Sequence, residues 1–403
     1  MGRMHSDISV RNDMAEHEGS GNSLSEINAR RLSRHPRGRR SYPRAWSGAG
    51  TDILLLDGES YFAPQVVRSL AVARRWRIHL LARPTGSSRP RLEWSRHVRS
   101  FHWAYGGEAG YVAAIERAVR ATGARVIVPI TEETSLFCIQ HRAELEQITG
   151  LAMLPPAGMF SLAIDKARLA AFMAKAGIPH PATKLPADPE LATLRFPVVL
   201  KLRRASGGAG MVNVSTPAQL RAQLAARADG EHVLVQEYIA GIDMGCSVLA
   251  EQGELVAATV QRGMWRPNGF SPSTEIAMEP HPQVLAVAQR LVAELGWSGI
   301  ANIDFRVDEA GQPHVLEING RYWATLLGST LAGVNFPDLV CRRALGEEVD
   351  RPPVAAGTFM QARRWLAELS RGRWRSGWTS LSLLLTDPLP ELCRVSARPE
   401  RAV

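Results

Sequence analysis

Residues 301–321 read ANIDFRVDEAGQPHVLEINGR, and this stretch gives the clearest indication of the fold. Polar and apolar residues alternate in two runs on either side of a polar turn, as expected of two antiparallel β-strands. In the first run Asp304 has apolar neighbours, so its carboxylate leaves the opposite face of the strand. In the second run Glu317 and Asn319 are two residues apart and share one face. If the runs pair through the turn at 308–312, these three side chains converge.

Converging carboxylate and amide oxygens are ligands that Mg²⁺ prefers, and sites of this kind also hold nucleotide phosphates. The hairpin therefore predicts a magnesium site, which Mn²⁺ would also fit. The alternative is a polar strand face that only meets solvent. Apolar sequence surrounds both carboxylates and Arg321 continues the polar cluster, which favours the metal site.

A buried-looking strand at residues 197–202 contains a single cation, Lys201. An unpaired buried ammonium group is costly, so we expect Lys201 to face an anion. The glycine-rich run 205–210 follows, and it fits either a hairpin turn or a backbone loop that cradles phosphate. Lys201 favours the phosphate loop. Lys166, at the start of a helix predicted to run to Lys175, offers a second cation.

The chain has 403 residues, of which 45% are hydrophobic and 22% charged, a composition typical of a globular protein of about two or three domains. Its formal charge of +9 comes from its ends: residues 1–50 carry +4 and residues 351–403 carry +5, so residues 51–350 are neutral. A neutral body gives no electrostatic reason to expect a nucleic-acid partner.

The 4 cysteines show no pairing rhythm and no C-x-x-C motif, so neither a disulfide framework nor a zinc site is indicated. No apolar stretch approaches the roughly 18 residues of a membrane span, and the N-terminus lacks the apolar core of a secretory signal. These features predict a cytoplasmic location.

Residues 1–49 are polar without a sustained period, so we expect a disordered basic leader. Strands and helices alternate from Thr51 onward, which predicts a small α/β domain with a parallel sheet over residues 50–154. The acidic pair Glu132 and Glu133 directly follows a strand of this domain, where open α/β sheets place ligand groups. The alternative is an acidic first turn of the next helix, favoured by the helix dipole.

The chain resembles the ATP-grasp superfamily and is nearest to its carbamoyl-phosphate-synthetase-like carboxylate–amine ligases. The residues that carry the resemblance follow in order: Lys166, Lys201, the loop 206–210, Gln236-Glu237-Tyr238-Ile239, Asp243, Asp304 and Glu317-Ile318-Asn319-Gly320-Arg321. The last motif and its spacing from Asp304 are specific, whereas the glycine loop is not. The resemblance covers about residues 51–345.

The resemblance implies a fold of α/β and α+β type. A small open parallel-sheet pre-ATP-grasp domain, residues 50–154, would precede a two-lobed ATP-grasp domain, residues 155–350. The small lobe would span about residues 160–236 and the large lobe about residues 237–350. Residues 351–403 would form a basic C-terminal appendage rich in Trp and Arg.

The resemblance also implies which residues bind ATP. Lys166 and Lys201 would contact the phosphates, and the glycine loop with Ser206, Gly207 and Gly208 would close over them. The other nucleotide contacts would come from the hinge residues Gln236, Glu237, Tyr238 and Ile239 at the adenine edge and from Asp243 at the ribose hydroxyls.

Two Mg²⁺ ions would be held by Asp304, Glu317 and Asn319. The catalytic residues would be Arg321, which would stabilise an acyl phosphate, and Lys201. The chain departs from the common pattern at Gln236 and Asp304, where many members have Glu. Neither change abolishes the implied role, because an amide can still form a hydrogen bond with adenine and a shorter carboxylate can still bind Mg²⁺.

The implied reaction transfers the γ-phosphoryl group of ATP to a small-molecule carboxylate and joins the acyl phosphate to an amine, releasing ADP and phosphate. It needs no side-chain nucleophile, and the sequence shows no Ser-His-Asp or Cys-His arrangement. Two alternatives stay open: a phosphotransferase on the same scaffold and a non-catalytic nucleotide-binding accessory protein. The sequence does not indicate the oligomeric state.

The stretch between residues 262 and 275 is too irregular for a regular element and too aromatic for a linker. Loops of this kind often act as lids, so Arg262, Trp265 and Arg266 are candidates for substrate contact, together with Glu132. The alternative is a surface loop.

Residues 359–385 interleave three tryptophans, among them Trp365 and Trp378, with five arginines. Such a mixture suits weak peripheral contact with a membrane, or an acidic partner. The favoured alternative is a helical appendage whose aromatic side chains pack on the body, with residues 381–385 as a last apolar docking segment.

Overall fold

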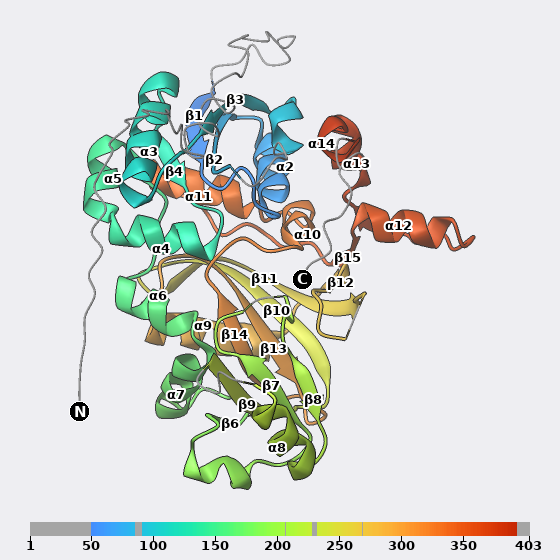
Figure 1. Ribbon diagram of the computed structural model, residues 1–403. Coiled ribbons are helices and arrows are strands. Elements are labelled where there is room, and N and C mark those ends of the chain that lie inside the picture. Colours follow the sequence, from blue (N-terminus) through green and yellow to red (C-terminus); the bar gives the residue numbers. More distant parts are fainter. Residues whose placement is uncertain (1–49, 85–90, 206, 228–231, 268, 393–403) are drawn as a thin grey trace, which may run out of the picture. The chain divides into compact units, whose positions relative to one another are not determined.

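The computed structural model describes residues 50–84, 91–205, 207–227, 232–267 and 269–392 (Figure 1). The predicted leader, residues 1–49, lies outside these ranges, and so does Ser206 of the glycine loop. The described residues form a 5-stranded, a 7-stranded and a 4-stranded sheet. The fold is the mixed α/β and α+β type that the resemblance implied.

The 5-stranded sheet is parallel, with the strand order β3-β2-β1-β4-β5. Its strands are β1 (Thr51–Leu55), β2 (Trp76–Ala82), β3 (Val98–Trp103), β4 (Val126–Val128) and β5 (Gly150–Leu151). The last three residues of β1, Ile53 to Leu55, are apolar and buried because both faces of the sheet are covered. Ile53 and Leu55 pack in one hydrophobic cluster, and Leu54 packs in another on the opposite face.

The helices around this sheet are α2 (Ala63–Ala73), α3 (Glu108–Thr122), α4 (Glu132–Gln140) and α5 (Arg142–Ile148), with the 3-10 turn η1 (Arg91–Trp94). Local sequence determines where α4 begins: the side chain of Thr131 caps the helix by accepting a hydrogen bond from the Thr134 amide. The cap places Glu132 in the first helical turn, just beyond the carboxyl end of β4.

The 4-stranded sheet is antiparallel, with the order β6-β9-β7-β8. Its strands are β6 (Thr183–Lys184), β7 (Val198–Leu202), β8 (Val212–Val214) and β9 (Val233–Glu237), and the helical segments beside it are α8 (Pro217–Ala225) and η2 (Pro189–Thr193). Val198 and Leu200 pack against Leu220 of α8 on one face. Lys201 alternates with them, so its side chain leaves the other face.

The 7-stranded sheet has the order β14-β13-β10-β11-β12-β15-β16 and is antiparallel except for its last pair. Its strands are β10 (Ile242–Glu251), β11 (Glu254–Trp265), β12 (Glu275–Met278), β13 (Gly299–Val307), β14 (Pro313–Asn319), β15 (Gly357–Met360) and β16 (Trp378–Thr379). The helices of this part are α6 (Ala157–Ala163), α7 (Lys166–Ala176), α9 (Pro282–Glu294), α10 (Leu326–Leu331) and α11 (Phe336–Ala344). The predicted large lobe ends at residue 350, whereas β15 and β16 extend the same sheet.

The C-terminal residues contact the body, but the favoured interpretation holds only in part: Trp378 packs against a hydrophobic cluster, whereas Trp374 is 74% exposed. After β15 come α12 (Ala362–Leu369), α13 (Leu381–Thr386) and α14 (Leu389–Leu392), and Figure 1 shows α12 beside β15. Asp387 is buried and accepts hydrogen bonds from the Ser95 hydroxyl (2.5 Å) and the Arg96 amide (3.0 Å). Among the described residues, no helix has the length and apolar character that crossing a membrane requires.

Candidate active site

The β13–β14 hairpin brings the predicted metal ligands together. Asp304 lies opposite Glu317, and Asn302 lies opposite Asn319, so the four side chains share a face. The turn between the strands is closed by the Asp308 amide, which donates to the Gln312 carbonyl (3.0 Å). The pairing and the turn are therefore those that the sequence predicted.

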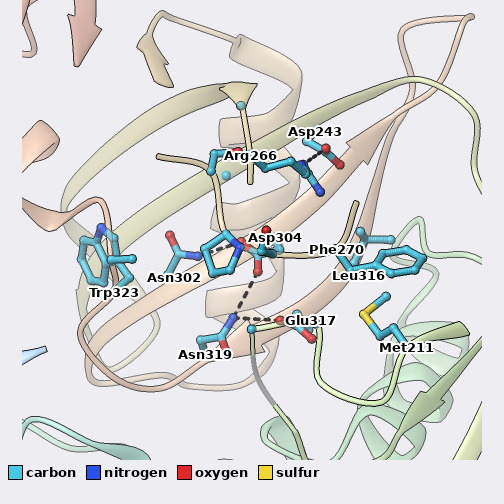
Figure 2. A pocket seen from close by; sticks show the side chains of 18 of the residues that line it. Met211, Asp243, Arg266, Phe270, Asn302, Asp304, Leu316, Glu317, Asn319 and Trp323 are labelled. Carbon is cyan, nitrogen blue, oxygen red and sulfur yellow. Dashed lines mark hydrogen bonds and ion pairs between the residues drawn. The ribbon is translucent and has the colours of Figure 1, made fainter. Parts of the chain in front are cut away.

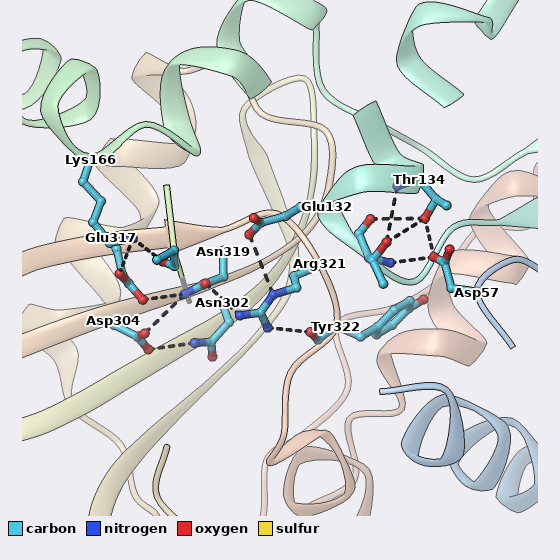
Figure 3. A network of polar contacts seen from close by, with 12 residues as sticks. Asp57, Glu132, Thr134, Lys166, Asn302, Asp304, Glu317, Asn319, Arg321 and Tyr322 are labelled. Carbon is cyan, nitrogen blue, oxygen red and sulfur yellow. Dashed lines mark hydrogen bonds and ion pairs between the residues drawn. The ribbon is translucent and has the colours of Figure 1, made fainter. Parts of the chain in front are cut away.

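Hydrogen bonds connect these four side chains (Figures 2 and 3). The Asn319 amide nitrogen donates to Asp304 Oδ2 (3.2 Å) and to Glu317 Oε1 (3.3 Å). The Asn302 amide nitrogen donates to Asp304 Oδ1 (2.8 Å). Sequence reasoning missed Asn302, although its position two residues before Asp304 on one strand was a usable signal.

Two carboxylates are crowded at this point. Desolvation and the neighbouring Glu317 raise the pKa of Asp304 to about 7. Desolvation acts in the same direction on Glu317, but Lys166 and Lys201 outweigh it and lower the pKa of Glu317. Like charges held this close favour a divalent cation between them, so the donor set fits Mg²⁺.

Asn319 fits the predicted set less directly. Its oxygen accepts a hydrogen bond from Arg321 Nη2 (3.0 Å) while its nitrogen faces the carboxylates, so a metal-ligand role requires the opposite orientation of the amide. In the ranges that the structure describes, no group of three or more His, Cys, Asp and Glu side chains could hold a metal ion. A metal site at the hairpin would thus consist of two carboxylates and amide oxygens.

The two predicted lysines lie beside this hairpin. Lys166 Nζ is 3.0 Å from Glu317 Oε2 and donates to the Ala205 carbonyl (2.5 Å). Lys201 is buried and donates to Gln236 Oε1 (2.6 Å). Desolvation lowers the pKa of Lys201 to about 8, with Glu317 acting in the opposite direction. The structure therefore gathers both cations at the carboxylate pair.

The side chain of Gln236 is directed to Lys201 and not toward open space. Its oxygen accepts from Lys201, and its nitrogen donates to the Thr183 hydroxyl (3.0 Å). Gln236 thus orients the lysine ammonium.

A cavity of about 510 Å³ connects these groups. The predicted residues that line it are Lys166, Lys201, Gly207, Gly208, Gln236, Glu237, Tyr238, Ile239, Asp243, Arg266, Asp304, Glu317, Asn319 and Arg321. The wall continues beyond the charged groups through Phe62, Trp323, Thr325 and Gln361. One cavity thus combines an anion-binding end with a more apolar extension.

The glycine loop touches the loop between β11 and β12. Gly207 and Gly208 have φ values of 69° and 80°, in the left-handed region that favours glycine. A Cβ atom at Gly208 would overlap the carbonyl of Phe270. Figure 2 shows Phe270 beside Met211, which follows the glycine loop.

The predicted ribose acid, Asp243, is paired with two arginines. Arg306 Nη1 is 2.9 Å from Asp243 Oδ1, and Arg266 forms an ion pair with the other oxygen (Figure 2). Arg262 does not reach the cavity: its Nε is 2.8 Å from Glu279 Oε1. The structure gives no support to the predicted substrate role of Arg262, because Arg262 alternates along β11 with the cavity-lining Gln261.

Arg321, which follows the β13–β14 hairpin, lies beside Glu132 of α4, next to the 5-stranded sheet (Figure 3). Its Nε lies 3.8 Å from Glu132 Oε1, and its guanidinium carbon is 4.5 Å from the centroid of the Phe62 ring. Desolvation raises the pKa of Glu132, although Arg321 acts in the opposite direction. Glu133 instead pairs with Arg83 at the surface, as the acidic-turn interpretation expects, and the ligand role of Glu132 stays a prediction.

A buried aspartate that sequence reasoning missed holds Glu132 in place. Asp57 accepts hydrogen bonds from the amides of Ile130 (3.2 Å) and Thr131 (3.0 Å) and from the Thr134 hydroxyl. The Ile130 carbonyl in turn accepts from the Tyr322 amide (3.3 Å), the residue after Arg321. These contacts fix the start of α4 against the end of the hairpin.

Residues 229–364 match a family model described as "ATP-grasp in the biosynthetic pathway with Ter operon". Over this range the chain is similar to ATP-grasp proteins, which confirms the resemblance seen in the sequence.

Individual relatives cover only parts of the chain. Vancomycin B-type resistance protein VanB of Enterococcus faecalis is 26% identical over 181 residues, which are 38% of this chain and 51% of that protein. A D-alanine–D-alanine ligase of Carboxydothermus hydrogenoformans is 28% identical over 204 residues, 44% of this chain and 63% of that enzyme. The chain thus spans about half the length of VanB, and the likeness does not by itself transfer an activity.

A solved structure shares the fold over most of both chains. The biotin carboxylase domain of a 2-oxoglutarate carboxylase from Hydrogenobacter thermophilus, in complex with MgADP, ADP and bicarbonate, superposes with a TM-score of 0.57. The match covers 77% of this chain and 74% of that one at 19% identity. At this identity the likeness shows the fold alone.

Proposed function

We propose that the protein is an ATP-dependent ligase that activates a small-molecule carboxylate as an acyl phosphate and joins it to an amine. One observation carries the proposal: a carboxylate pair, two lysines and an arginine line a single cavity of about 510 Å³. This combination suits phosphoryl transfer between anions, where catalysis consists mainly of positioning and charge neutralisation.

The lysines would bind the phosphates of ATP. Lys201 carries its charge below a pKa of about 8, and Gln236 holds its ammonium group at 2.6 Å. Lys166 stands at the first residue of α7, where its ammonium lies between Glu317 and the backbone of the glycine loop. Two fixed cations lower the cost of bringing a polyphosphate next to a carboxylate substrate.

Asp304 and Glu317 would hold Mg²⁺, which supplies Lewis-acid neutralisation of the phosphate oxygens when bound. The biotin carboxylase structure with the same fold is a complex with MgADP, which supports both ligands. Arg321 is held by Asn319 and by the Tyr322 carbonyl, and it would bind the carboxylate and then the acyl phosphate formed from it. The amine would attack this acyl group and phosphate would leave.

Glu132 would orient the amine. A carboxylate 3.8 Å from Arg321 adds a negative group at the edge of an otherwise cationic site, where it attracts an ammonium and positions it near the acyl carbon. A smaller cavity of about 230 Å³ is lined by Glu132, Lys166 and Glu317, which gives the amine a route to this point.

The domain boundaries at residues 49 and 154 remain part of the proposal, whereas the boundary at residue 350 would move beyond β16, which belongs to the large-lobe sheet. A cytoplasmic location does as well, and it is supported by Cys138, Cys246 and Cys341, which are buried free thiols of the kind a reducing compartment maintains.

An ADP-release screen over pairs of carboxylates and amines tests the proposal. We expect ADP only when both substrates are present. ADP released with one substrate, together with a stable phosphorylated product, would instead identify a phosphotransferase. A protein that binds ADP tightly but releases none from ATP with any pair would be a nucleotide-binding accessory protein.

A further inference from the structure

We propose that the C-terminal segment, residues 357–379, is part of the nucleotide site because it positions the loop between β11 and β12 over the cavity. This inference rests on the proposed function and adds a positioning role for residues outside the set that carries the ATP-grasp resemblance. The loop comprises residues 266, 267 and 269–274, and most of its described residues line the cavity.

Both ends of the loop are attached to one arginine of α12. At the first end, the Arg364 guanidinium carbon lies 4.1 Å from the centroid of the Trp265 ring. At the second end, Arg364 Nε lies 3.6 Å from Glu275 Oε2, and Arg375 pairs with the other carboxylate oxygen. Glu275 is only 3% exposed, and breaking a buried ion pair by removing one partner is destabilising.

Gln361 forms a third contact with the loop between β11 and β12. Its backbone amide donates to the Thr274 carbonyl (2.9 Å), and the Thr274 amide donates to the Trp265 carbonyl (2.9 Å). The Gln361 side chain donates to the Ala324 carbonyl (3.3 Å) and lines the cavity itself. The segment thus supplies one wall residue in addition to the attachments.

The part of the loop that reaches furthest into the cavity touches the predicted nucleotide residues. Arg266 pairs with Asp243, and the Phe270 carbonyl lies against Gly208 (Figure 2). The ends of the loop, Trp265 and Glu275, are paired across β11 and β12, so a displacement of this end of the strand pair would move the loop and both contacts. The attachment at Arg364 therefore acts on nucleotide binding through the loop.

Glu368 holds Arg364 in the required place. This carboxylate is 4% exposed and lies 2.6 Å from Arg364 Nη1, 3.2 Å from Arg371 Nη1 and 3.6 Å from Arg373 Nη1. Arg364 is the arginine that joins the two buried carboxylates, Glu275 and Glu368. Arg371 meets Glu368 in the same way, and no contact between Arg371 and the loop ends is found in the described part of the chain, so it supplies a matched control.

The test compares Arg364→Gln with Arg371→Gln in the full-length protein. Hydrogen exchange of the peptide covering residues 269–275, measured without nucleotide, should be faster in Arg364→Gln and unchanged in Arg371→Gln. The dissociation constant for ADP, measured by calorimetry with Mg²⁺, should rise roughly tenfold only in Arg364→Gln. Equal exchange or equal ADP affinity in the two variants would overturn the inference.

A double variant separates positioning from general stability. Glu275→Gln combined with Arg364→Gln removes a buried charge together with its partner, so the unfolding temperature should recover toward that of the wild type. The ADP affinity should stay low because the loop end remains unattached, and recovery of the affinity along with the stability would contradict positioning. If the wild-type protein binds no ADP, the proposed function fails, and the hydrogen-exchange comparison still decides whether the segment holds the loop.

Discussion

Asp304 and Glu317 lie opposite each other on β13 and β14, and the Asn319 amide donates a hydrogen bond to both carboxylates. The pair is asymmetric. Lys166 lies 3.0 Å from Glu317, whereas the hydrogen-bond donors beside Asp304 are the neutral amides of Asn302 and Asn319. Glu317 thus carries its charge at neutral pH, which would make it the stronger of the two ligands for the proposed metal ion.

Glu317→Gln should lower turnover severely while ADP binding is partly kept. The change removes a negative charge and preserves size, and losing such a charge at the reacting phosphates costs on the order of 3 kcal/mol or more in transition-state stabilisation. Steady-state kinetics at saturating Mg²⁺ measures the effect. Glu309→Gln, in the exposed turn of the same hairpin, is the control, and near-normal turnover of Glu317→Gln would refute the assigned role.

Nucleotide affinity should weaken as the pH rises above about 8. Desolvation lowers the pKa of Lys201 to about 8, so above this pH the free protein must take up a proton before the lysine can pair with phosphate. Affinity should fall by up to about tenfold per pH unit in that range. ADP titrations between pH 7 and 9 measure the slope, and Lys201→Arg should flatten it because arginine stays charged. An equal slope in both proteins would assign the titration to another group.

The lowered pKa of Lys201 should also make the free energy of unfolding depend on pH. This dependence has the opposite sign to that of the nucleotide affinity. The unfolded chain holds the Lys201 proton up to the ordinary lysine pKa, whereas the folded protein releases it near pH 8. The unfolded state therefore binds more protons over the interval between the two values, and the contribution of Lys201 to the free energy of unfolding increases with pH there. In denaturant titrations over this interval, the free energy of unfolding of the wild type should rise with pH relative to that of Lys201→Met.

Gly208→Ala should impair nucleotide binding more than Gly207→Ala. Both glycines have positive φ, so alanine strains the backbone at either position by about 1 kcal/mol. At Gly208 the new methyl group would also overlap the Phe270 carbonyl, whereas nothing lies within 4 Å of the corresponding position at Gly207. The KM for ATP of the two variants provides the comparison. A larger rise for Gly207→Ala would show that the two loops do not meet in the working enzyme.

Asp387→Ala should destabilise the protein without changing its affinity for ADP. The carboxylate is 2% exposed and binds Ser95 and Arg96, far along the chain from the cavity residues. Leaving the Ser95 hydroxyl and the Arg96 amide without an acceptor costs about 1–3 kcal/mol for each group that stays buried. The temperature of thermal unfolding measures the loss of stability, and calorimetry measures the affinity for ADP. Unchanged unfolding would mean that the contact of α13 with η1 contributes little.

The hairpin could be predicted from sequence because its information is local. Strand alternation with a period of two placed Asp304, Glu317 and Asn319 on one face, and the polar turn between them fixed the pairing. The same alternation would have separated Arg262 from the cavity, since its neighbours Gln261 and Gly263 line it. Grouping Arg262 with Arg266 as one loop overlooked that β11 continues to Trp265.

Contacts between distant segments had no such local signal. β3 was not anticipated because Ser100 and His102 interrupt its apolar pattern. The Ser100 hydroxyl is hydrogen-bonded to His79 of β2 and to His102. β15 joins β12 through pairing that depends on packing around Phe359, which brings Gln361 to the cavity. The arginines of the C-terminal segment looked like a surface patch because nothing in the sequence pairs them with Glu275.

The transfer of a carboxylate oxygen to phosphate tests the central claim most directly. The amine expels the oxygen that joined the acyl group to phosphorus, so this oxygen leaves with the phosphate. With a substrate pair from the ADP-release screen and the carboxylate labelled with ¹⁸O, mass spectrometry should find one labelled oxygen per inorganic phosphate, formed together with the C–N product. Unlabelled phosphate accompanying that product would show that no acyl phosphate forms and would contradict the proposed mechanism.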